Sequence, residues 1–495
     1  MIPVQNVPFA AVMLYLAGGV SCCVLSGKNA RRLCVFLNAA VTVMSVLLLR
    51  YCLSTGESYH YMMGHFPAPW GNELRVGALE ALMGLAFSAV MTLTLLGGTA
   101  HIVEDCEKDK LSLFYTVVSL LMASLTALVY TNDIFTAYVF VEINTIASCA
   151  LVMVRYRSGR ALVSTARYLM MSLLGSGLFL MGIVILYGIT GHLLMEPMGD
   201  KIAELAGNGE YALPLTITVG FFAVGLAIKS ALWPFSGWLP DAHASATAAS
   251  SAILSGLVLK GYIFLLIKVF YRVFGMGLVF ADGAESILLF CGLGAMVMGS
   301  VYALGERDIK RLLAWSSVAQ VGYIYAGIGL GTEAGMAAAC MQIFVHAVTK
   351  PLLFLSAGEF MSVSGGKRDF DHIRGAARRT PVAGLAFAVG TLSMIGIPLF
   401  GGFSVKLELC TAALSAGGVR QWTLLAALVI STVLNALYYL PALSLLFAKD
   451  EEPGTKRFDL RYVLAAVVLM ALNLLLGQRA GMITKVIDSG LTLMD

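Results

Sequence analysis

Long apolar runs separated by short polar loops make up most of the chain, and this pattern predicts a bundle of membrane-spanning helices. A helix needs roughly 20 apolar residues to cross a bilayer, and the sequence supplies many runs of that length. The fourteen expected spans have the approximate ranges 8–27, 32–52, 77–99, 111–130, 133–154, 164–190, 212–233, 244–271, 285–304, 309–330, 335–361, 382–416, 421–446 and 458–478.

The composition agrees with this pattern. Hydrophobic residues make up 59% of the 495 residues and charged residues 13%, whereas soluble domains average about 45–50% apolar and about 25% charged residues. The polar stretches are too short to enclose a soluble core. The expected fold class is therefore an all-α integral membrane protein that crosses the bilayer many times.

Cysteine usage gives no sign of a bound group. The nine cysteines are scattered without a C-x-x-C pair, which argues against an iron–sulfur cluster, a zinc site and a c-type haem. We therefore expect no cofactor and no metal. Because Lys28, Arg31 and Arg32 follow the first apolar run instead of preceding it, we interpret that run as a retained span, not a cleaved signal peptide.

Lysine and arginine residues predict the orientation, because cytoplasmic loops are rich in both. With the N-terminus outside, about two thirds of the 33 lysine and arginine residues fall in inside loops and about a quarter in outside segments. An even number of spans brings the C-terminus to the outside as well. The expected location is the cell membrane.

Four lysines remain, each well inside an apolar span: Lys229, Lys260, Lys350 and Lys406. A charge at the centre of a span costs roughly 2.5–3.5 kcal/mol on insertion scales, so four unpaired charges would cost on the order of 10 kcal/mol. An ionisable residue inside the membrane is a functional candidate by default.

Two further ionisable residues extend this set. Glu142 lies deep in the span expected at 133–154, and it is the expected acidic partner of a buried lysine because pairing offsets the desolvation of both groups. His346 and Lys350 are four residues apart, so they share a helix face, and both kinds of side chain can exchange protons. These residues form the candidate proton-translocating site, and an inert buried ion-pair network is the alternative.

Charged residues near the ends of spans are expected to be structural. Lys268 is expected to reach the surface by snorkelling, and Glu80 and Glu359 are expected to serve the structure of their helices. His243 lies beside a helix break on the cytoplasmic side, where proton uptake and loop packing are equally open interpretations. Asp241, close to it in the sequence, is included as a possible uptake residue.

Two spans carry a Gly/Pro interruption beside a buried lysine. The interrupting residues are Pro234 and Gly237 in one span and Pro398, Gly401 and Gly402 in the other. Such breaks are tolerated at membrane depth only where protein or water satisfies the freed backbone groups. A matching pair of them points to a transport site built from repeats, and the interval of five spans predicts two inverted units.

These units, spans 4–8 and 9–13, divide the chain into four parts. The expected parts are an N-terminal segment at 1–110, a first unit at 111–275, a second unit at 276–446 and a C-terminal segment at 447–495.

Three stretches resemble a known family. They read KSALWPFSGWLPDAHASATAASSAILSGLVLKGYIFLL from Lys229, ERDIKRLLAWSSVAQVGY from Glu306 and HAVTKPLLFLSAGEF from His346. They resemble signature blocks of the antiporter-like subunits of respiratory complex I, Mrp cation/proton antiporters and membrane-bound hydrogenases, over about residues 75–440. The resemblance implies fourteen helices with an inverted five-helix repeat.

The resemblance also implies a role for each candidate residue. It matches Glu142 to the helix-5 glutamate, Lys229 to the helix-7 lysine, Lys260 to the helix-8 basic residue, His346 and Lys350 to the connecting helix-11 groups, and Lys406 to the terminal basic residue of helix 12. In the family these groups form a hydrated, charged axis along the middle of the membrane that moves protons.

Details of the sequence point to a divergent member that is similar to the Mrp D type. GHFPAPWGNELRVGALEALMGL, from Gly64, resembles the lead-in of D-type subunits, and Lys406 stands where the M type has glutamate. The chain stops soon after the last expected helix, without the long lateral helix of the L type. Relatives usually read PDAHAEAPSPVSALLSG where this chain reads PDAHASATAASSAILSG, so its path between helices 7 and 8 is expected to differ.

The expected function is that of a proton-translocating subunit that is not catalytic alone. Its expected partners are other membrane subunits, the lipid bilayer, H⁺ and, in an Mrp setting, Na⁺, but not nucleic acid. A hydrogenase-type or NADH:quinone oxidoreductase-type complex is the alternative setting. A stand-alone solute transporter, a redox subunit holding haem or quinone, and a purely structural subunit are alternatives of other classes.

Overall fold

Helices make up most of the chain in the computed structural model, which describes residues 4–66, 71–155, 158–207, 211–275, 279–449 and 459–494. Pro67–Trp70 of the stretch that begins at Gly64, and three of the basic residues counted in inside loops, Arg157, Lys456 and Arg457, lie outside these residues. The helices of the bundle are α1 (Val7–Val24), α2 (Gly27–Thr55), α3 (Ala78–Gly97), α5 (Leu111–Tyr130), α6 (Ile134–Val152), α7 (Gly159–Thr190), α9 (Ala212–Lys229), α12 (Leu259–Val269), α13 (Val279–Leu304), α14 (Ile309–Gly329), α15 (Glu333–Val363), α17 (Pro381–Ile395), α18 (Gly401–Ala416), α19 (Gly418–Leu446) and α20 (Leu460–Gln478).

Other elements connect or flank these helices. They are α4 (Thr99–Asp105), α8 (Met195–Gly207), α10 (Trp238–Ser245), α11 (Ala248–Ile253), α16 (Ala376–Arg379), α21 (Ala480–Thr492), the π-helical turns Leu254–Val258 and Phe270–Phe274, and the strands β1 (Tyr59–Met62) and β2 (Glu73–Val76).

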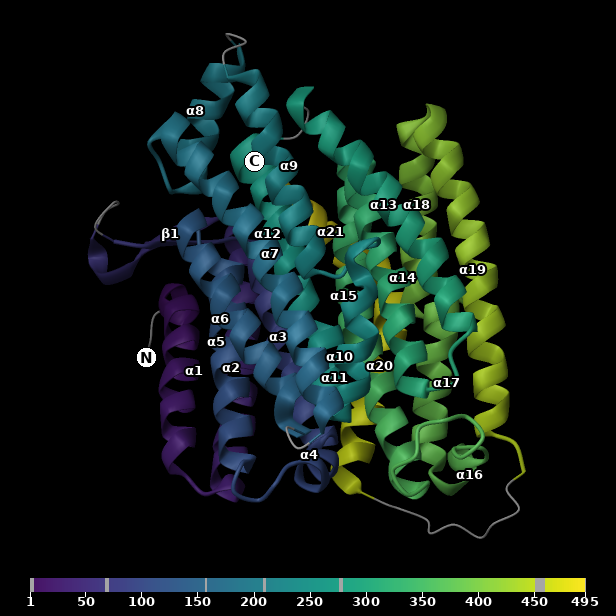
Figure 1. Ribbon diagram of the computed structural model, residues 1–495. Helices are drawn as coiled ribbons and strands as arrows, with labels where there is room; N and C mark the ends of the chain where they lie inside the picture. Colours follow the sequence, from purple (N-terminus) through teal and green to yellow (C-terminus); the bar gives the residue numbers. More distant parts are fainter. Residues whose placement is uncertain are drawn as a thin grey trace.

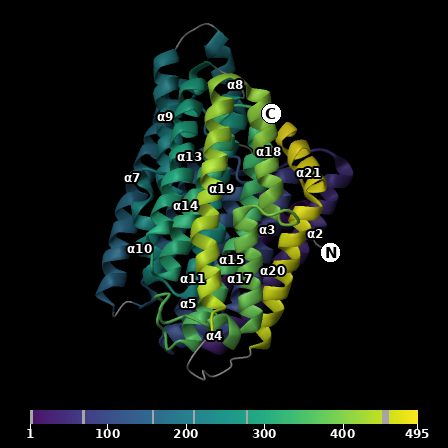
Figure 2. The ribbon, with the colours of Figure 1, turned by 90° about the vertical axis from the view of Figure 1, so that its right-hand side faces the viewer.

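The helices stand side by side in one bundle, in which segments far apart in the sequence meet (Figure 1). The C-terminal helices α20 and α21 pack against α3, and Figure 2 shows them on that flank of the bundle. Helices α4 and α16 lie together at one end, which we call the basic end because the lysine and arginine distribution predicts it to be cytoplasmic.

Twelve helices in the described part of the chain are long and apolar enough to cross a membrane. The helices α14, α17 and α18 are not among them. The chain is therefore a multi-pass membrane protein, while the count of fourteen spans and the inverted repeats stay predictions.

Several expected elements differ in detail. The span expected at 382–416 is two helices, α17 and α18, because the backbone breaks between them. The span expected at 244–271 is interrupted by the π-helical turn Leu254–Val258 and follows a separate helix, α10. The elements α8, α21 and the hairpin β1–β2 were not expected, since each is shorter than the apolar run that a span requires.

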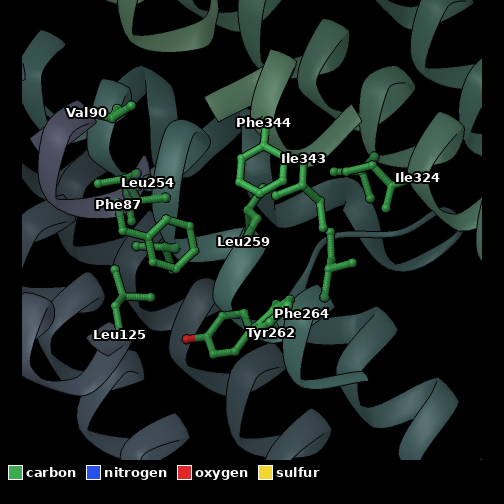
Figure 3. Packing of buried hydrophobic residues seen from close by; sticks show 14 of the residues in the cluster. Phe87, Val90, Leu125, Leu254, Leu259, Tyr262, Phe264, Ile324, Ile343 and Phe344 are labelled. Carbon is green, nitrogen blue, oxygen red and sulfur yellow. The ribbon is translucent and has the colours of Figure 1, made fainter. Parts of the chain in front are cut away.

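The core of the bundle surrounds α12 and α15, which are buried on all sides. A helix that is apolar all round belongs in the interior of a bundle. Figure 3 shows Phe344 of α15 beside Leu259 of α12, with Tyr262, Phe87 and Leu125 packed nearby. Polar groups on α12 and α15 therefore face protein and not lipid.

Side-chain caps fix where several helices begin. Asp133 accepts a hydrogen bond from the backbone of α6, Asp308 from α14 and Thr332 from α15. Such caps satisfy backbone N–H groups that have no partner inside the helix. The helices that carry Glu142, His346 and Lys350 therefore start at defined positions.

Glycine permits the close approach of α13 and α14. A Cβ at Gly322 of α14 would lie 2.6 Å from the backbone oxygen of Gly292 in α13 and 2.6 Å from the backbone nitrogen of Met296. Small residues let the backbones of membrane helices approach this closely.

We expect Gly322→Ala to lower the melting temperature of the purified protein by several degrees, since overpacking a core costs about 1–3 kcal/mol. Thermal unfolding in detergent measures this. The control is Gly177→Ala on α7, where a Cβ meets no atom within 4 Å. Equal melting temperatures for the two variants would contradict the tight α13–α14 contact.

A charged cluster joins the hairpin to its neighbours. His60 Nδ1 lies 2.7 Å from Glu73 Oε1 on the opposite strand, and Asn132 Nδ2 donates to the same oxygen at 2.8 Å. Glu196 Oε2 lies 3.6 Å from His60 Nε2, and Glu196 Oε1 lies 2.6 Å from Arg75 Nη1. The hydrogen bond to Glu73 raises the pKa of His60, and the same bond lowers the pKa of Glu73.

These shifts predict that the hairpin is held most firmly in mildly acidic solution. The His60 contribution is complete below its ordinary pKa of 6.5 and is lost as the pH rises through its raised pKa. The Glu73 contribution is present above its ordinary pKa of 4.5 and is lost as the pH falls through its lowered pKa. Amide hydrogen exchange in β1 and β2, corrected for intrinsic rates, should be slower at about pH 6 than at about pH 9. His60→Asn should remove this difference; a difference that survives the substitution would refute the explanation.

Candidate functional site

Lys229 is the last residue of α9, so its ammonium lies where the helix breaks inside the bundle. Its Nζ donates to Thr145 Oγ1 at 2.7 Å and to Ser172 Oγ at 3.4 Å, and lies 3.6 Å from Glu142 Oε1. The ring centroid of Tyr262 is 5.3 Å away. The side chain is completely buried, and hydroxyl groups, a carboxylate, an aromatic face and the C-terminal end of a helix all favour a cation there.

Glu142 lies at the edge of the bundle and not in its centre. Its side chain is 24% exposed. Phe135, Val139 and Ile146 on the same helix are exposed at 45%, 40% and 66%, and their spacing places them near Glu142 on one face of α6. We call these four residues the α6 face. It is an apolar surface with a single carboxylate.

Lys260 lies in α12 immediately after the π-helical turn Leu254–Val258. Its Nζ donates to the backbone oxygen of Ser255, which belongs to that turn. A π-helical turn widens the helix and leaves carbonyl groups available to other donors. The lysine is fully buried, and none of the described carboxylates lies within ion-pair distance of it.

His346 and Lys350 occupy successive turns of α15. Lys350 Nζ donates to the backbone oxygen of Leu313 and to Ser316 Oγ, both at 2.9 Å and both in α14. Both ring nitrogens of His346 are buried without a hydrogen-bond partner among the described residues. Helix α15 continues through Pro351 to Val363.

Lys406 lies in α18, the second half of the other broken span. Its Nζ donates to the backbone oxygen of Ile395 at 2.6 Å and to Thr432 Oγ1 at 2.8 Å, and the ring centroid of Tyr323 is 5.4 Å away. Ile395 is the last residue of α17. The lysine therefore satisfies a carbonyl group that the helix break has freed.

The two breaks have similar backbone features. Helix α9 ends at Lys229 and α10 begins at Trp238, with Ala231 at φ 57° between them. Helix α17 ends at Ile395 and α18 begins at Gly401, with Leu399 at φ 84° between them. Non-glycine residues rarely adopt positive φ, and such strain clusters at functional sites.

The prolines and glycines named from the sequence occupy these breaks or their edges. Pro234 precedes the turn Phe235–Gly237, and Pro398 lies directly before Leu399. Gly401 and Gly402 open α18, and a Cβ at Gly402 would lie 1.8 Å from the backbone oxygen of Ser393.

The two possible uptake residues have different surroundings. Asp241 lines a cavity of about 920 Å³ at the basic end, and its carboxylate pairs with Arg167 at 2.8 Å and Arg311 at 2.7 Å. His243 is fully buried, stacks on Phe354 at 4.8 Å, and has no hydrogen-bond partner for either ring nitrogen among the described residues. Asp241 thus lies at the surface of this region and His243 beneath it.

The six residues form two clusters and one separate site. Lys229 and Glu142 form one cluster. Lys260, His346 and Lys350 form another, close enough for both lysines to act electrostatically on His346. Lys406 contacts Ile395, Thr432 and Tyr323, and none of these residues belongs to either cluster. Holding a buried ion without a counter-charge costs several kcal/mol, so it is unfavourable for all four lysines to be charged together.

The expectation that Lys268 reaches the surface was wrong. It is fully buried, and its Nζ donates to the backbone oxygens of Leu128 at 3.2 Å, Val129 at 3.0 Å and Thr131. These carbonyl groups end α5, where a helix lacks internal donors. Snorkelling assumes that the ammonium reaches solvent. Here the carbonyl groups at the end of α5 take the place of solvent, and the local sequence does not reveal that α5 lies there.

Glu80 has a structural role, as expected. Its carboxylate accepts a hydrogen bond from the backbone of Gly77 and pairs with Arg272, and both charged side chains are 1% exposed. Arg272 is one of the basic residues that the lysine and arginine distribution assigns to the outside segments, yet it is buried. Arg272 and Lys268 are four residues apart, so they lie on one face of a helix. This spacing was the sequence feature that could have revealed that they are buried together.

Lys310 is a buried lysine that the sequence did not reveal. It is one of the basic residues that the lysine and arginine distribution counts in the inside loops, yet it is 2% exposed and donates to the backbone oxygen of Ala246, between α10 and α11. It also acts electrostatically on His243. Its place in the first turn of α14, close to Arg307 and Arg311, made it resemble a surface residue.

His60, Glu73 and Glu196 are close enough together to offer ligands to a metal ion. They already hydrogen-bond or form ion pairs with one another and with Asn132 and Arg75. These contacts satisfy the three side chains by themselves.

Comparison with known proteins places this geometry in context. The family described as NADH:quinone oxidoreductase/Mrp antiporter, TM, matches residues 131–435. NADH-quinone oxidoreductase subunit N from Desulforudis audaxviator (strain MP104C) is 32% identical over 424 residues, which are 84% of this chain and 81% of that protein. The D-type subunit of the Na(+)/H(+) antiporter from Alkalihalophilus pseudofirmus is 28% identical over 422 residues, which are 84% and 82% of the two chains.

Solved structures share the fold. A chain of the membrane-bound sulfane sulfur reductase (MBS), an archaeal respiratory membrane complex, superimposes with a TM-score of 0.87 at 23% identity, over 99% of this chain and 97% of that chain. A chain of the Mrp complex from Dietzia sp. DQ12-45-1b gives a TM-score of 0.87 at 22% identity, over 100% and 98% of the two chains.

Replacing a glycine with alanine should lower the yield of folded protein at the α17–α18 break but not at the α9–α10 break. Gly402→Ala should sharply reduce the amount of folded protein, because the new Cβ would collide with a backbone oxygen at 1.8 Å. Gly237→Ala is the matched control, since Gly237 has φ −60° and a Cβ there would have no atom within 4 Å. Size-exclusion chromatography of the two variants in detergent measures the yield. Similar yields would show that the α17–α18 break does not need the close approach.

Proposed function

We propose that this chain, which belongs to the NADH:quinone oxidoreductase/Mrp antiporter family, moves protons through the membrane by way of its buried ionisable residues. It is an antiporter-like membrane subunit of the kind found in complex I, Mrp and MBS-type complexes. It is not catalytic alone, and the energy for transport comes from its partners.

The observation that carries the proposal is the environment of the buried lysines. Each donates to backbone carbonyl or hydroxyl oxygens, and only Lys229 has a carboxylate within ion-pair distance among the described residues. Side chains in this state gain or lose a proton at a smaller cost than members of closed ion pairs, because no counter-charge is left unpaired. His346 on α15 can also gain or lose a proton without leaving a counter-charge unpaired, because both of its ring nitrogens are buried without a hydrogen-bond partner among the described residues.

The proposed route begins at the basic end. A proton enters through the cavity beside Asp241, passes His243 and loads Lys229. When Glu142 is close, its negative charge favours the protonated form of Lys229; when Glu142 moves away, the proton leaves. It then passes Lys260 and the His346–Lys350 pair to Lys406 and to the outside. A charge at one site disfavours a like charge at the next, which separates successive steps.

The α6 face suggests how partner subunits take part. The Glu142 side chain is partly exposed on this face, although its Oε1 atom is buried. A carboxylate that is partly exposed to lipid is costly and is stabilised by a basic group on a covering protein. We infer that a neighbouring membrane subunit covers this face and sets the position of Glu142. Exchange of H⁺ for Na⁺ is the proposed activity in an Mrp-type assembly. The similar proteins include an NADH-quinone oxidoreductase subunit as well as an antiporter subunit. A hydrogenase-type or NADH:quinone oxidoreductase-type assembly is therefore the alternative proposal.

Residues 111–275 and 276–446 are proposed to form the two inverted units, between residues 1–110 and 447–495. Both termini are proposed to lie outside the cell membrane, with the basic end in the cytoplasm. The basic cavity near Asp241 supports this orientation.

The test is ion transport in membrane vesicles that contain the assembled complex. Glu142→Ala and Lys229→Ala should each abolish transport while the complex still assembles, because each removes one member of the switch. The matched control is the exposed pair Glu204 and Lys201, which are 2.7 Å apart on α8. Their alanine variants should transport normally. Transport near the wild-type rate in Glu142→Ala or Lys229→Ala would refute the proposal.

A further inference from the structure

His101 and Glu359 form a buried pair at the basic end. His101 Nε2 of α4 lies 3.0 Å from Glu359 Oε1 of α15, and the two side chains are 4% and 3% exposed. Neither atom has a hydrogen-bond partner among the described residues apart from this contact. Glu359 was expected to serve only the structure of its helix, and a partner on α4 could not be inferred from the local sequence.

Gly358 makes this contact possible. A Cβ at position 358 would lie 2.9 Å from His101 Nε2 and 2.8 Å from the Cβ of Ala248 in α11. The imidazole therefore rests directly on the backbone of α15.

The pair has a connection to the surface and a limited set of charged neighbours. Glu104 Oε2, at 51% exposure, lies 3.9 Å from His101 Nδ1 on the same helix, and Asp105 beside it pairs with Arg155. Helix α11, which packs against α4, brings no ionisable side chain, and the only one in α3 is Glu80 near its far end. From α20, Tyr462 acts electrostatically with Glu359.

Polar contacts between α15 and α20 lead from this pair toward the proposed proton route. Ser356 Oγ lies 2.9 Å from Tyr462 Oη, one turn along α15 from Glu359. Two turns further, Asn473 Nδ2 donates to Thr349 Oγ1 at 2.6 Å, beside Lys350. Asn473 Oδ1 is buried without a protein partner among the described residues, and a buried polar atom of this kind is commonly satisfied by water.

We propose that His101 and Glu359 form a second proton-loading site, which supplies Lys350 and His346 from the basic end without passing through Lys229. The imidazole accepts a proton from surface water at Nδ1 and releases its Nε2 proton to the Glu359 carboxylate. The pair begins as a neutral imidazole with a carboxylate and ends as a neutral imidazole with a carboxylic acid, so the proton taken from water neutralises the carboxylate and the imidazole changes from the Nε2–H to the Nδ1–H tautomer. The carboxyl group then releases its proton toward Ser356 and Thr349 through water.

This inference rests on the proposed function, and conservative variants test it in the assembled complex. Glu359→Gln keeps the size of the side chain and an oxygen that accepts from His101, but it cannot carry a proton. Glu359→Asp keeps the carboxyl group. Proton transport per assembled complex should fall at least about tenfold in Glu359→Gln and in His101→Gln, and it should be largely retained in Glu359→Asp.

The matched control is the other close histidine–glutamate pair, His60 and Glu73, which are 2.7 Å apart on the hairpin. His60→Gln and Glu73→Gln should transport at the wild-type rate. A purely structural role for Glu359 predicts the opposite order, with Glu359→Gln tolerated better than Glu359→Asp, and that result would overturn the proposal.

The outcome separates this inference from the proposed function. If Glu359→Gln transports normally while Lys229→Ala is inactive, the loading site is wrong and the proposed function stands. If Glu142→Ala and Lys229→Ala both transport normally, the proposed function itself fails. If Glu359→Gln does not assemble, His101→Gln decides: transport at the wild-type rate in that variant would refute the loading site.

Discussion

The whole arrangement depends on how oxygen atoms compensate for lysine side chains that are buried in an apolar bundle. A buried ion without compensation costs several kcal/mol, and only Lys229 has a carboxylate within ion-pair distance among the described residues. The others rely on carbonyl and hydroxyl groups, such as those of Leu313 and Ser316 at Lys350. These neutral oxygens stabilise the protonated lysine, but they carry no charge that would be left unpaired if the lysine lost its proton. A lysine that transfers protons needs surroundings that tolerate both of its protonation states.

Backbone irregularities supply many of these oxygens. Lys406 donates to the carbonyl of Ile395 where α17 ends, Lys260 to Ser255 in a π-helical turn, and Lys310 to Ala246 between two short helices. Freed backbone groups are tolerated at membrane depth only if something satisfies them. Each irregularity and its lysine therefore stabilise each other, which explains why breaks and buried charges occur together along the chain.

The sequence predicted the features that depend on composition and spacing. Apolar run length predicted the all-α membrane fold, and the cost of a buried charge singled out Lys229 and Lys260 without any structural information. It could not reveal contacts that the tertiary fold creates. Lys268 was misjudged because the end of α5 lies against it, and the pairing of His101 with Glu359 depends on a glycine in one helix and a short helix far away in the sequence.

The central claim is that water connects the buried lysines, so that protons pass between groups that do not touch one another. The most direct measurement is a high-resolution experimental map of the complex in lipid, in which ordered water is visible. The account predicts water molecules that link Lys229, Lys260, His346 and Lys406 and that contact the unpartnered imidazole nitrogens of His346. A map that shows these residues separated by closely packed apolar side chains, with no water between them, would contradict it.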